Sequence, residues 1–216
     1  MIPTNDCLMF QHIHSKSKCA LWLGLTLPRT MEYCLTHQMD YQLVARDLGD
    51  LSPAGEWGHW IMVQLLTEFL EMDYKYIIYL DADTIIADMT VDLREACVED
   101  KIGAVWHNLS MLTPDISHFN AGALYISNTP KIREFVSQWL AGYPGTREFP
   151  WLDQGVFGRM GTEMGIINKL DNRFNAGHVS PSDHPVVLGL HGLRNRYEVM
   201  KEKIVQLQEM EHENKI

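Results

Sequence analysis

The chain has 216 residues, of which 46% are hydrophobic and 21% are charged, proportions that are ordinary for a globular protein. This length favours a single domain over residues 1–216 with a substantial buried core. The formal net charge of -10 argues against a nucleic acid or an anionic membrane as the partner, because both bind clustered lysine and arginine. The longest apolar stretch, residues 19–27, is too short to span a bilayer, and the N-terminus lacks the pattern of a secretory signal. We therefore expect a cytoplasmic protein.

Segments with the periodicity of strands and of helices alternate along the chain, which predicts an α/β fold. Strands are expected at residues 7–14, 41–45, 76–80, 102–106, 123–126 and 186–190, with a turn at 120–122 leading into the fifth. Helices are expected at residues 57–72, 91–98, 131–140 and 153–160, after a first helical stretch that Pro28 interrupts and that resumes over 31–38. A last helix is expected over about residues 195–214.

Two carboxylates follow the strand expected at residues 76–80. Asp81 and Asp83 are separated by one residue, and apolar residues continue on the other side of them. On an extended chain, residues two apart point to the same face. Two like charges placed together at the end of a buried strand repel each other unless a cation lies between them. The pair therefore predicts a divalent metal site, at the strand ends where α/β proteins bind ligands.

His191 is the third candidate ligand of this metal. It follows the apolar strand expected at residues 186–190 and precedes Gly192, whose lack of a side chain lets a ligand approach closely. Two carboxylates and one imidazole suit Mn²⁺ better than Mg²⁺, which prefers oxygen ligands, although Mg²⁺ remains possible.

Arg194 and Arg196 follow directly. Positive charge beside a metal suggests phosphate binding, while exposed arginines at the start of the last helix are an equally good interpretation. Asp153 either caps the start of a helix or, with Gln154, places a carboxylate and an amide over a substrate. Asn120 adds a second amide.

These motifs together resemble the GT-A-fold glycosyltransferases. The chain is similar to the glycogenin-like and lipopolysaccharide galactosyltransferase-like group, and to the fungal and plant α-galactosyl- and mannosyltransferases. The matching segments keep the order of the family and are Tyr33–Tyr41, Tyr79–Thr84, Phe119–Leu124, Leu152–Gly155 and Leu190–Gly192. The resemblance implies one Rossmann-like GT-A domain with a mixed, mostly parallel sheet flanked by helices.

The resemblance also implies a UDP-sugar donor, UDP-glucose or UDP-galactose, and transfer of the hexose to a carbohydrate, lipid or protein acceptor, with retention of anomeric configuration favoured. It implies that Asp83 and His191 bind the metal, with Asp81 serving the metal, the ribose or both. Asn120, Asp153 and Gln154 would face the transferred sugar and form the catalytic set. The nucleotide and its phosphates would contact Gln11, His12, His14, Asp81, Ala82, Gly192, Arg194 and Arg196.

Two other functions are compatible with parts of the sequence. Asp81 and Asp83 also fit a haloacid-dehalogenase-type phosphatase, as nucleophile and general acid. That motif normally opens its domain, whereas two strands and two helical segments precede it here. A catalytically silent nucleotide-sugar-binding module is the second alternative, and the intact set of Asp81, Asp83 and His191 argues against it.

Overall fold

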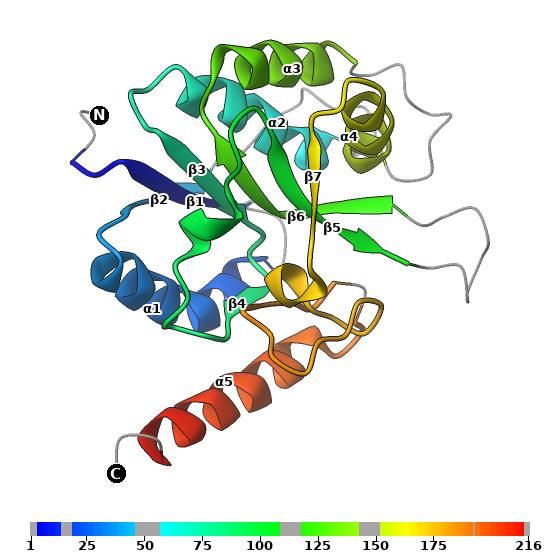
Figure 1. The fold of residues 1–216 in the computed structure, drawn as a ribbon. Helices are drawn as coiled ribbons and strands as arrows, with labels where there is room; N and C mark the ends of the chain where they lie inside the picture. The colour runs from blue at the N-terminus through cyan, green and yellow to red at the C-terminus, as the bar shows by residue number, and fades with distance from the viewer. Residues whose placement is uncertain are drawn as a thin grey trace.

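The computed structural model of the protein describes residues 4–13, 19–45, 57–108, 118–142, 152–191 and 193–213. Six strands form one sheet in the order β2-β1-β3-β6-β5-β7 (Figure 1). Their bounds are Cys7–Ile13 (β1), Asp40–Ala45 (β2), Tyr76–Leu80 (β3), Ile102–His107 (β5), His118–Ser127 (β6) and Ile167–Leu170 (β7). β6 is antiparallel to its neighbours β3 and β5, and the other neighbouring pairs are parallel. The predicted α/β fold with a mixed, mostly parallel sheet is confirmed.

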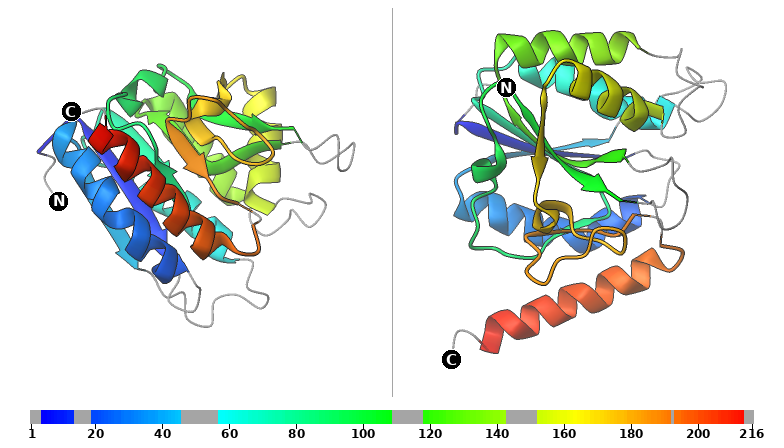
Figure 2. Two further views of the ribbon diagram at one scale, coloured as in Figure 1. Left: turned by 90° about the horizontal axis from the view of Figure 1, so that it is seen from below. Right: turned by 45° about the vertical axis from the view of Figure 1, so that its right-hand side comes forward.

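Helices cover both faces of this sheet. They are α1 (Cys19–Thr36), α2 (Trp57–Leu70), α3 (Pro130–Ala141), α4 (Leu152–Glu163) and α5 (Arg196–Glu213). Figures 1 and 2 show α2, α3 and α4 on one face and α1 on the other, with α5 lying outside α1. In the described part of the chain, no helix has both the length and the apolar character needed to cross a membrane.

The two faces of the sheet belong to different parts of the core. In β1, Leu8 and Phe10 pack with α2, α3 and α4, while Cys7 and Met9 pack with Tyr33 of α1 and its neighbours. Side chains alternate across a strand, so a strand that is buried on both faces must be apolar at every position. This explains why Cys7–Phe10 of β1 and the whole of β3 are unbroken runs of apolar and aromatic residues.

A second, two-stranded sheet lies beside the large one. β4 (Thr84–Ile86) directly follows the Asp81–Asp83 segment and pairs antiparallel with β8 (Val187–Gly189). This pairing joins two segments that are distant in sequence. It brings the end of β8 to the end of β3.

Helix α1 is continuous, so the interruption predicted at Pro28 was wrong. Proline removes one hydrogen bond and crowds the carbonyl of the residue four positions earlier, which here is Gly24. Both Gly24 and Pro28 lie on the exposed side of α1. Water can therefore reach the carbonyl that loses its partner, and the helix continues.

Three further predictions differ from the structure. Residues 120–122 lie inside the continuous strand β6 rather than in a turn, and the helix predicted at 91–98 is only a 3-10 turn over Leu93–Ala96. Strand β7 was not predicted, because Ile167–Leu170 contains two polar residues and none of the four is fully buried. The last helix, Arg196–Glu213, lies within the predicted range of 195–214.

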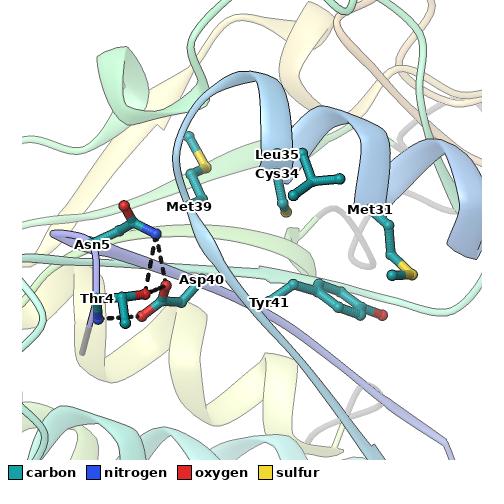
Figure 3. Close-up of a pocket in the computed structure, with 8 residues that line it drawn as sticks. All are labelled: Thr4, Asn5, Met31, Cys34, Leu35, Met39, Asp40 and Tyr41. Carbon is teal, nitrogen blue, oxygen red and sulfur yellow. Dashed lines mark hydrogen bonds between the residues drawn. The ribbon is translucent and has the colours of Figure 1, made fainter. Parts of the chain in front are cut away.

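A pocket lies beside the start of β2 (Figure 3). The parallel pairing of β1 with β2 and with β3 places it at the opposite end of these strands from Asp81. Its polar centre is Asp40, whose carboxylate accepts hydrogen bonds from Thr4 N at 2.9 Å, Asn5 Nδ2 at 2.7 Å and the Tyr74 hydroxyl at 3.0 Å. Burial acts to raise the pKa of Asp40, but these hydrogen bonds outweigh it and lower the pKa to about 2. The carboxylate is thus engaged within the protein, where it fastens the N-terminal segment to β2.

We predict that Asp40→Asn lowers the free energy of unfolding by about 1 kcal/mol at pH 7, because an amide cannot accept all of these hydrogen bonds. The folded-state pKa is depressed, so the contribution of Asp40 is present above pH 4 and is lost as the pH falls from about 4 to about 2. Urea denaturation at several pH values should show the two proteins converging over that range. Asp73→Asn, at an exposed position, is the control, and a loss that does not depend on pH would contradict the prediction.

Candidate active site

Asp81 and Asp83 lie in a turn between β3 and β4. Thr84 donates its backbone N–H and its hydroxyl to the Asp81 carbonyl, at 3.1 and 2.7 Å. The two side chains are therefore brought together by a turn. Our expectation of an extended chain at this point was wrong, because the hydroxyl and the N–H of Thr84 fold the backbone back on itself.

The structure brings His191 to this carboxylate pair. His191 Nδ1 lies 3.3 Å from Asp83 Oδ1 and 3.8 Å from Asp81 Oδ2. The antiparallel pairing of β4 and β8 places it there, since Thr84 is opposite Gly189. One ligand atom from each of the three residues lies within 4.8 Å of the other two.

The charges of these three groups are strongly coupled. Burial and the neighbouring Asp83 raise the pKa of Asp81. Burial also acts to raise the pKa of Asp83, but His191 and Arg196 outweigh it and hold that pKa below its usual value. For His191, burial acts to lower the pKa, and the two carboxylates raise it. The site therefore stabilises positive charge at its centre.

The arrangement fits a bound divalent cation. Asp83 Oδ1 is buried without a well-formed hydrogen bond among the described residues, and its ion-pair contact with His191 Nδ1, at 3.3 Å, is long. A bound cation would satisfy this oxygen better. The Asp81 side chain is 37% exposed, so the group is open to solvent on one side. Two carboxylates and an imidazole are ligands that Mn²⁺ accepts.

Three residues from β1 and β3 hold Asp81 in place. The Tyr79 hydroxyl donates to Asp81 Oδ1 and lies 3.0 Å from His12 Nδ1. Gln11 is buried, donates Nε2 to the Asp81 carbonyl at 3.1 Å, and accepts from the Tyr41 hydroxyl at 3.0 Å. Gln11 and His12 therefore reach the predicted site, where their observed contacts are with the protein itself.

Arg196 connects the first turn of α5 to the site. Its Nη1 pairs with Asp83 Oδ2, and its guanidinium lies 4.3 Å from the ring centroid of Trp22 in α1. Its Nε is buried without a hydrogen-bond partner in the described structure. Arg194, two residues earlier in the chain, is exposed. Of the other predicted nucleotide contacts, Ala82 is buried in the turn, and His14 and Gly192 lie outside the described residues.

The three predicted sugar-binding residues lie on β6 and at the start of α4. Asn120 Oδ1 accepts from Gly122 N at 2.8 Å, and Gln154 Oε1 accepts from Ala121 N at 2.9 Å. Asp153 is buried, and its Oδ1 has no partner within the described structure. Burial, followed by the charge of Asp81, raises the pKa of Asp153 to about 8.

Gly122 and Gly189 leave the space that His191 occupies. A Cβ on Gly122 would lie 2.5 Å from His191 Cε1 and 2.7 Å from Asp81 Oδ2. A Cβ on Gly189 would lie 2.7 Å from His191 Nε2. Such separations are well below van der Waals contact, so any side chain at either position would displace the imidazole.

Sequence reasoning missed two residues of this site. Tyr79 shares a strand face with the position of Asp81, and this spacing could have identified it. Asn175, which is fully buried and donates Nδ2 to Asn120 Oδ1 at 2.7 Å, comes from a 3-10 turn after the unpredicted strand β7. Its sequence context carries no comparable signal.

Comparison with known proteins identifies the architecture. No protein-family model and no curated protein sequence matches the chain. Solved structures do match. A glycosyltransferase involved in the glycosylation of the major capsid of PBCV-1 superposes with a TM-score of 0.65 at 13% identity, over 90% of this chain and 98% of that one. The fold is that of a GT-A glycosyltransferase.

Two further GT-A neighbours support this assignment. The galactosyltransferase LgtC, in complex with donor and acceptor sugar analogs, gives a TM-score of 0.62 at 13% identity, over 92% of this chain and 95% of that one. Mouse xyloside xylosyltransferase 1 gives 0.52 at 12% identity, over 87% and 98%. At this level of identity the likeness concerns the fold, and the expected GT-A architecture is confirmed.

We predict that Gly122→Ala weakens Mn²⁺ binding by about tenfold or more, because the added methyl group displaces both His191 and Asp81. Titration of Mn²⁺, followed by the electron paramagnetic resonance signal of the free ion, measures this. Gly158→Ala is the matched control: a Cβ there meets nothing within 4 Å, and alanine should stabilise α4 by about 0.5–1 kcal/mol. Equal Mn²⁺ affinity in the two variants would contradict the prediction.

Proposed function

We propose that the protein is a metal-dependent glycosyltransferase that moves a hexose from a UDP-sugar to an acceptor hydroxyl. The observation that carries this proposal is the convergence of Asp81, Asp83 and His191 on a GT-A fold. The fold neighbours described above are glycosyltransferases, and the same three residues resemble the metal-binding set of the GT-A enzymes. UDP-glucose or UDP-galactose is the donor that we propose, with a carbohydrate, lipid or protein as the acceptor.

We assign the donor diphosphate to the side of the site beside Arg196. A buried guanidinium nitrogen without a partner is a donor that a phosphate oxygen can satisfy. The guanidinium already faces Asp83, so a phosphate bound to a cation at Asp83 would lie next to it. Arg194, exposed two residues earlier, adds positive charge at the entrance. The nucleotide would then extend toward the ends of β1 and β3, past Gln11, His12 and Ala82.

Transfer breaks the bond between the anomeric carbon and the β-phosphate oxygen, and the acceptor hydroxyl forms the new bond. A bound divalent cation supplies Lewis-acid stabilisation of the charge that develops on the leaving phosphate, of the order of several kcal/mol. Arg196 adds a second positive charge on the same side. Asp81 and Asp83 would hold that cation and so position the leaving group.

Asp153 would bind the transferred sugar as a neutral acid. Burial, followed by the charge of Asp81, raises the pKa of Asp153 to about 8 in the metal-free protein, where the carboxyl is mostly protonated at pH 7 and can donate a hydrogen bond. A base that removes the acceptor proton would need the ionised form at the working pH. We propose retention, as the family resemblance favours, because the leaving phosphate can then take that proton and no base is needed at Asp153. Gln154 and the Nδ2 of Asn120 are the neighbouring amide groups for the same sugar.

We predict that UDP raises the melting temperature only when Mn²⁺ is present. A ligand at 100 times its Kd stabilises the folded state by about 2.7 kcal/mol, or roughly 5–10 °C for a chain of this size. Asp83→Ala should remove this shift, while Asp183→Ala, an exposed acid outside the site, should keep it. If neither UDP nor a UDP-hexose shifts the wild-type protein, the phosphatase is to be tested with phosphomonoesters and Mg²⁺.

We predict that Asp153→Asn lowers kcat more than it weakens UDP binding, because the residue would contact the sugar and not the nucleotide. The melting temperature of the variant, relative to that of the wild type, should also be higher at pH 9 than at pH 6. A buried carboxyl with a raised pKa favours the protonated form, so the wild-type protein loses stability as the pH rises toward about 8, and the amide does not. Weaker UDP binding with unchanged kcat would place Asp153 in the nucleotide pocket instead.

A further inference from the structure

Two buried polar atoms beside the candidate metal centre lack partners among the described residues. One is Nε2 of His191, and the other is Oδ1 of Asn175. A Cβ placed on Gly189 would lie 2.7 Å from the first and 2.1 Å from the second. The two atoms therefore border the same small space beside Gly189. One of them can donate a hydrogen bond, and the other can only accept.

The orientation of the Asn175 amide is fixed by its neighbours. Gly122 N is a donor and binds Asn120 at 2.8 Å, so the atom of Asn120 at that position must be the oxygen. Asn175 binds the same oxygen at 2.7 Å and must present its Nδ2 there. Its carbonyl oxygen is consequently directed away from Asn120, into the space beside Gly189.

His191 has a complementary need. Its Nδ1 faces Asp83 and Asp81, so Nδ1 is the nitrogen that would give its lone pair to a cation bound between them. The proton of the neutral ring must then be on Nε2, which is buried and needs an acceptor. Histidine ligands of metals usually donate this second N–H to a carbonyl or a carboxylate, and losing that acceptor typically costs about 10- to 100-fold in metal affinity.

His107 is the rival acceptor. Its ring centroid lies 6.1 Å from that of His191, and its own Nε2 is also buried without a partner within the described residues. Burial, with His191 and His118, lowers the pKa of His107 to about 3, so the ring is neutral. The oxygen of Asn175 is favoured because its orientation is imposed by Asn120 and because it borders the same space as His191 Nε2.

We propose that Asn175 is a positioning residue that keeps the proton of His191 on Nε2 and so presents Nδ1 to the cation. The proposal rests on the metal site of the proposed function and adds a determinant of its affinity. In this proposal, strand β7 and the 3-10 turn Asn172–Asn175 contribute to the site because they position Asn175. A hydrogen bond from His191 Nε2 to Asn175 Oδ1 would extend to the ring the bonds that Gly122 and Asn175 donate to Asn120.

The first test is Mn²⁺ affinity without any nucleotide, measured from the resonance signal of the free ion. Asn175→Ala should weaken binding by about 10- to 100-fold. Ser180→Ala is the control. It removes a different buried polar atom, a hydroxyl without a hydrogen-bond partner among the described residues, and should bind Mn²⁺ like the wild type. Unchanged affinity in Asn175→Ala overturns the proposal. Asn175→Ser, whose side chain is too short to reach the ring, replaces Asn175→Ala if that variant does not fold.

Asp83→Ala separates this proposal from the proposed function. If Asp83→Ala binds Mn²⁺ as tightly as the wild type, the metal centre itself is wrong. If Asp83→Ala loses binding and Asn175→Ala does not, only the role of Asn175 is wrong. His107→Leu should leave affinity unchanged, and a loss there in place of Asn175→Ala would assign the acceptor to His107 and overturn the proposal.

The second test reads the proton directly. Nitrogen-15 NMR of the Mg²⁺-loaded protein should show a protonated Nε2 on His191, with a slowly exchanging N–H. In Asn175→Ala this N–H should exchange faster, while the melting temperature of the variant shows whether the fold is retained. A ring that is protonated on Nδ1 in the wild type would overturn the proposal.

Discussion

The repulsion between Asp81 and Asp83 is the constraint on which the site depends. Two carboxylates at the end of a buried strand cannot both be charged unless positive groups surround them. The structure supplies these groups from the far end of the chain, as His191 after β8 and Arg196 in α5. The Tyr79 hydroxyl adds a neutral donor to Asp81. An apolar core therefore ends in a cluster whose charges balance only when its distant parts are assembled.

The same constraint explains the small two-stranded sheet. The six-stranded sheet alone would leave Asp81 and Asp83 at the end of β3 without an imidazole. Pairing of β4 with β8 sets the register Thr84 opposite Gly189, and this register brings His191 to the carboxylates. Gly122 and Gly189 then leave the room that the ring needs. The position of His191 is thus determined by the pairing of β4 with β8 and by the space that the two glycines leave.

Much of the fold and the centre of the site could be predicted from the sequence, because they depend on local patterns. The apolar runs Cys7–Phe10 and Tyr76–Leu80 marked β1 and β3, and the Asp81–Asp83 spacing marked the candidate cation site. The features that were missed or misjudged depend on distant partners. Asn120–Gly122 has the composition of a turn, yet it lies in β6, where Asn175 and Gln154 bind it from two other elements. Likewise β7 is polar and half buried, so only its pairing with β5 reveals it as a strand. No local pattern contains that information.

The last helix is often the least constrained part of a domain, but here its packing affects the site. Arg196 pairs with Asp83 and stacks on Trp22, and near the other end of α5 Glu211 pairs with Arg29 of α1 at 2.5 Å. Arg29 is itself buried and donates Nη2 to the Ala87 carbonyl at 3.0 Å, just beyond β4. Helix α5 is therefore fastened at both ends to elements that carry or flank the carboxylate turn. An exposed ion pair contributes little, while a buried one is costly to break. The buried Arg196–Asp83 pair therefore holds α5 more firmly than the partly exposed Arg29–Glu211 pair does. The packing of α5 and the charged state of Asp83 consequently depend on each other, through Arg196.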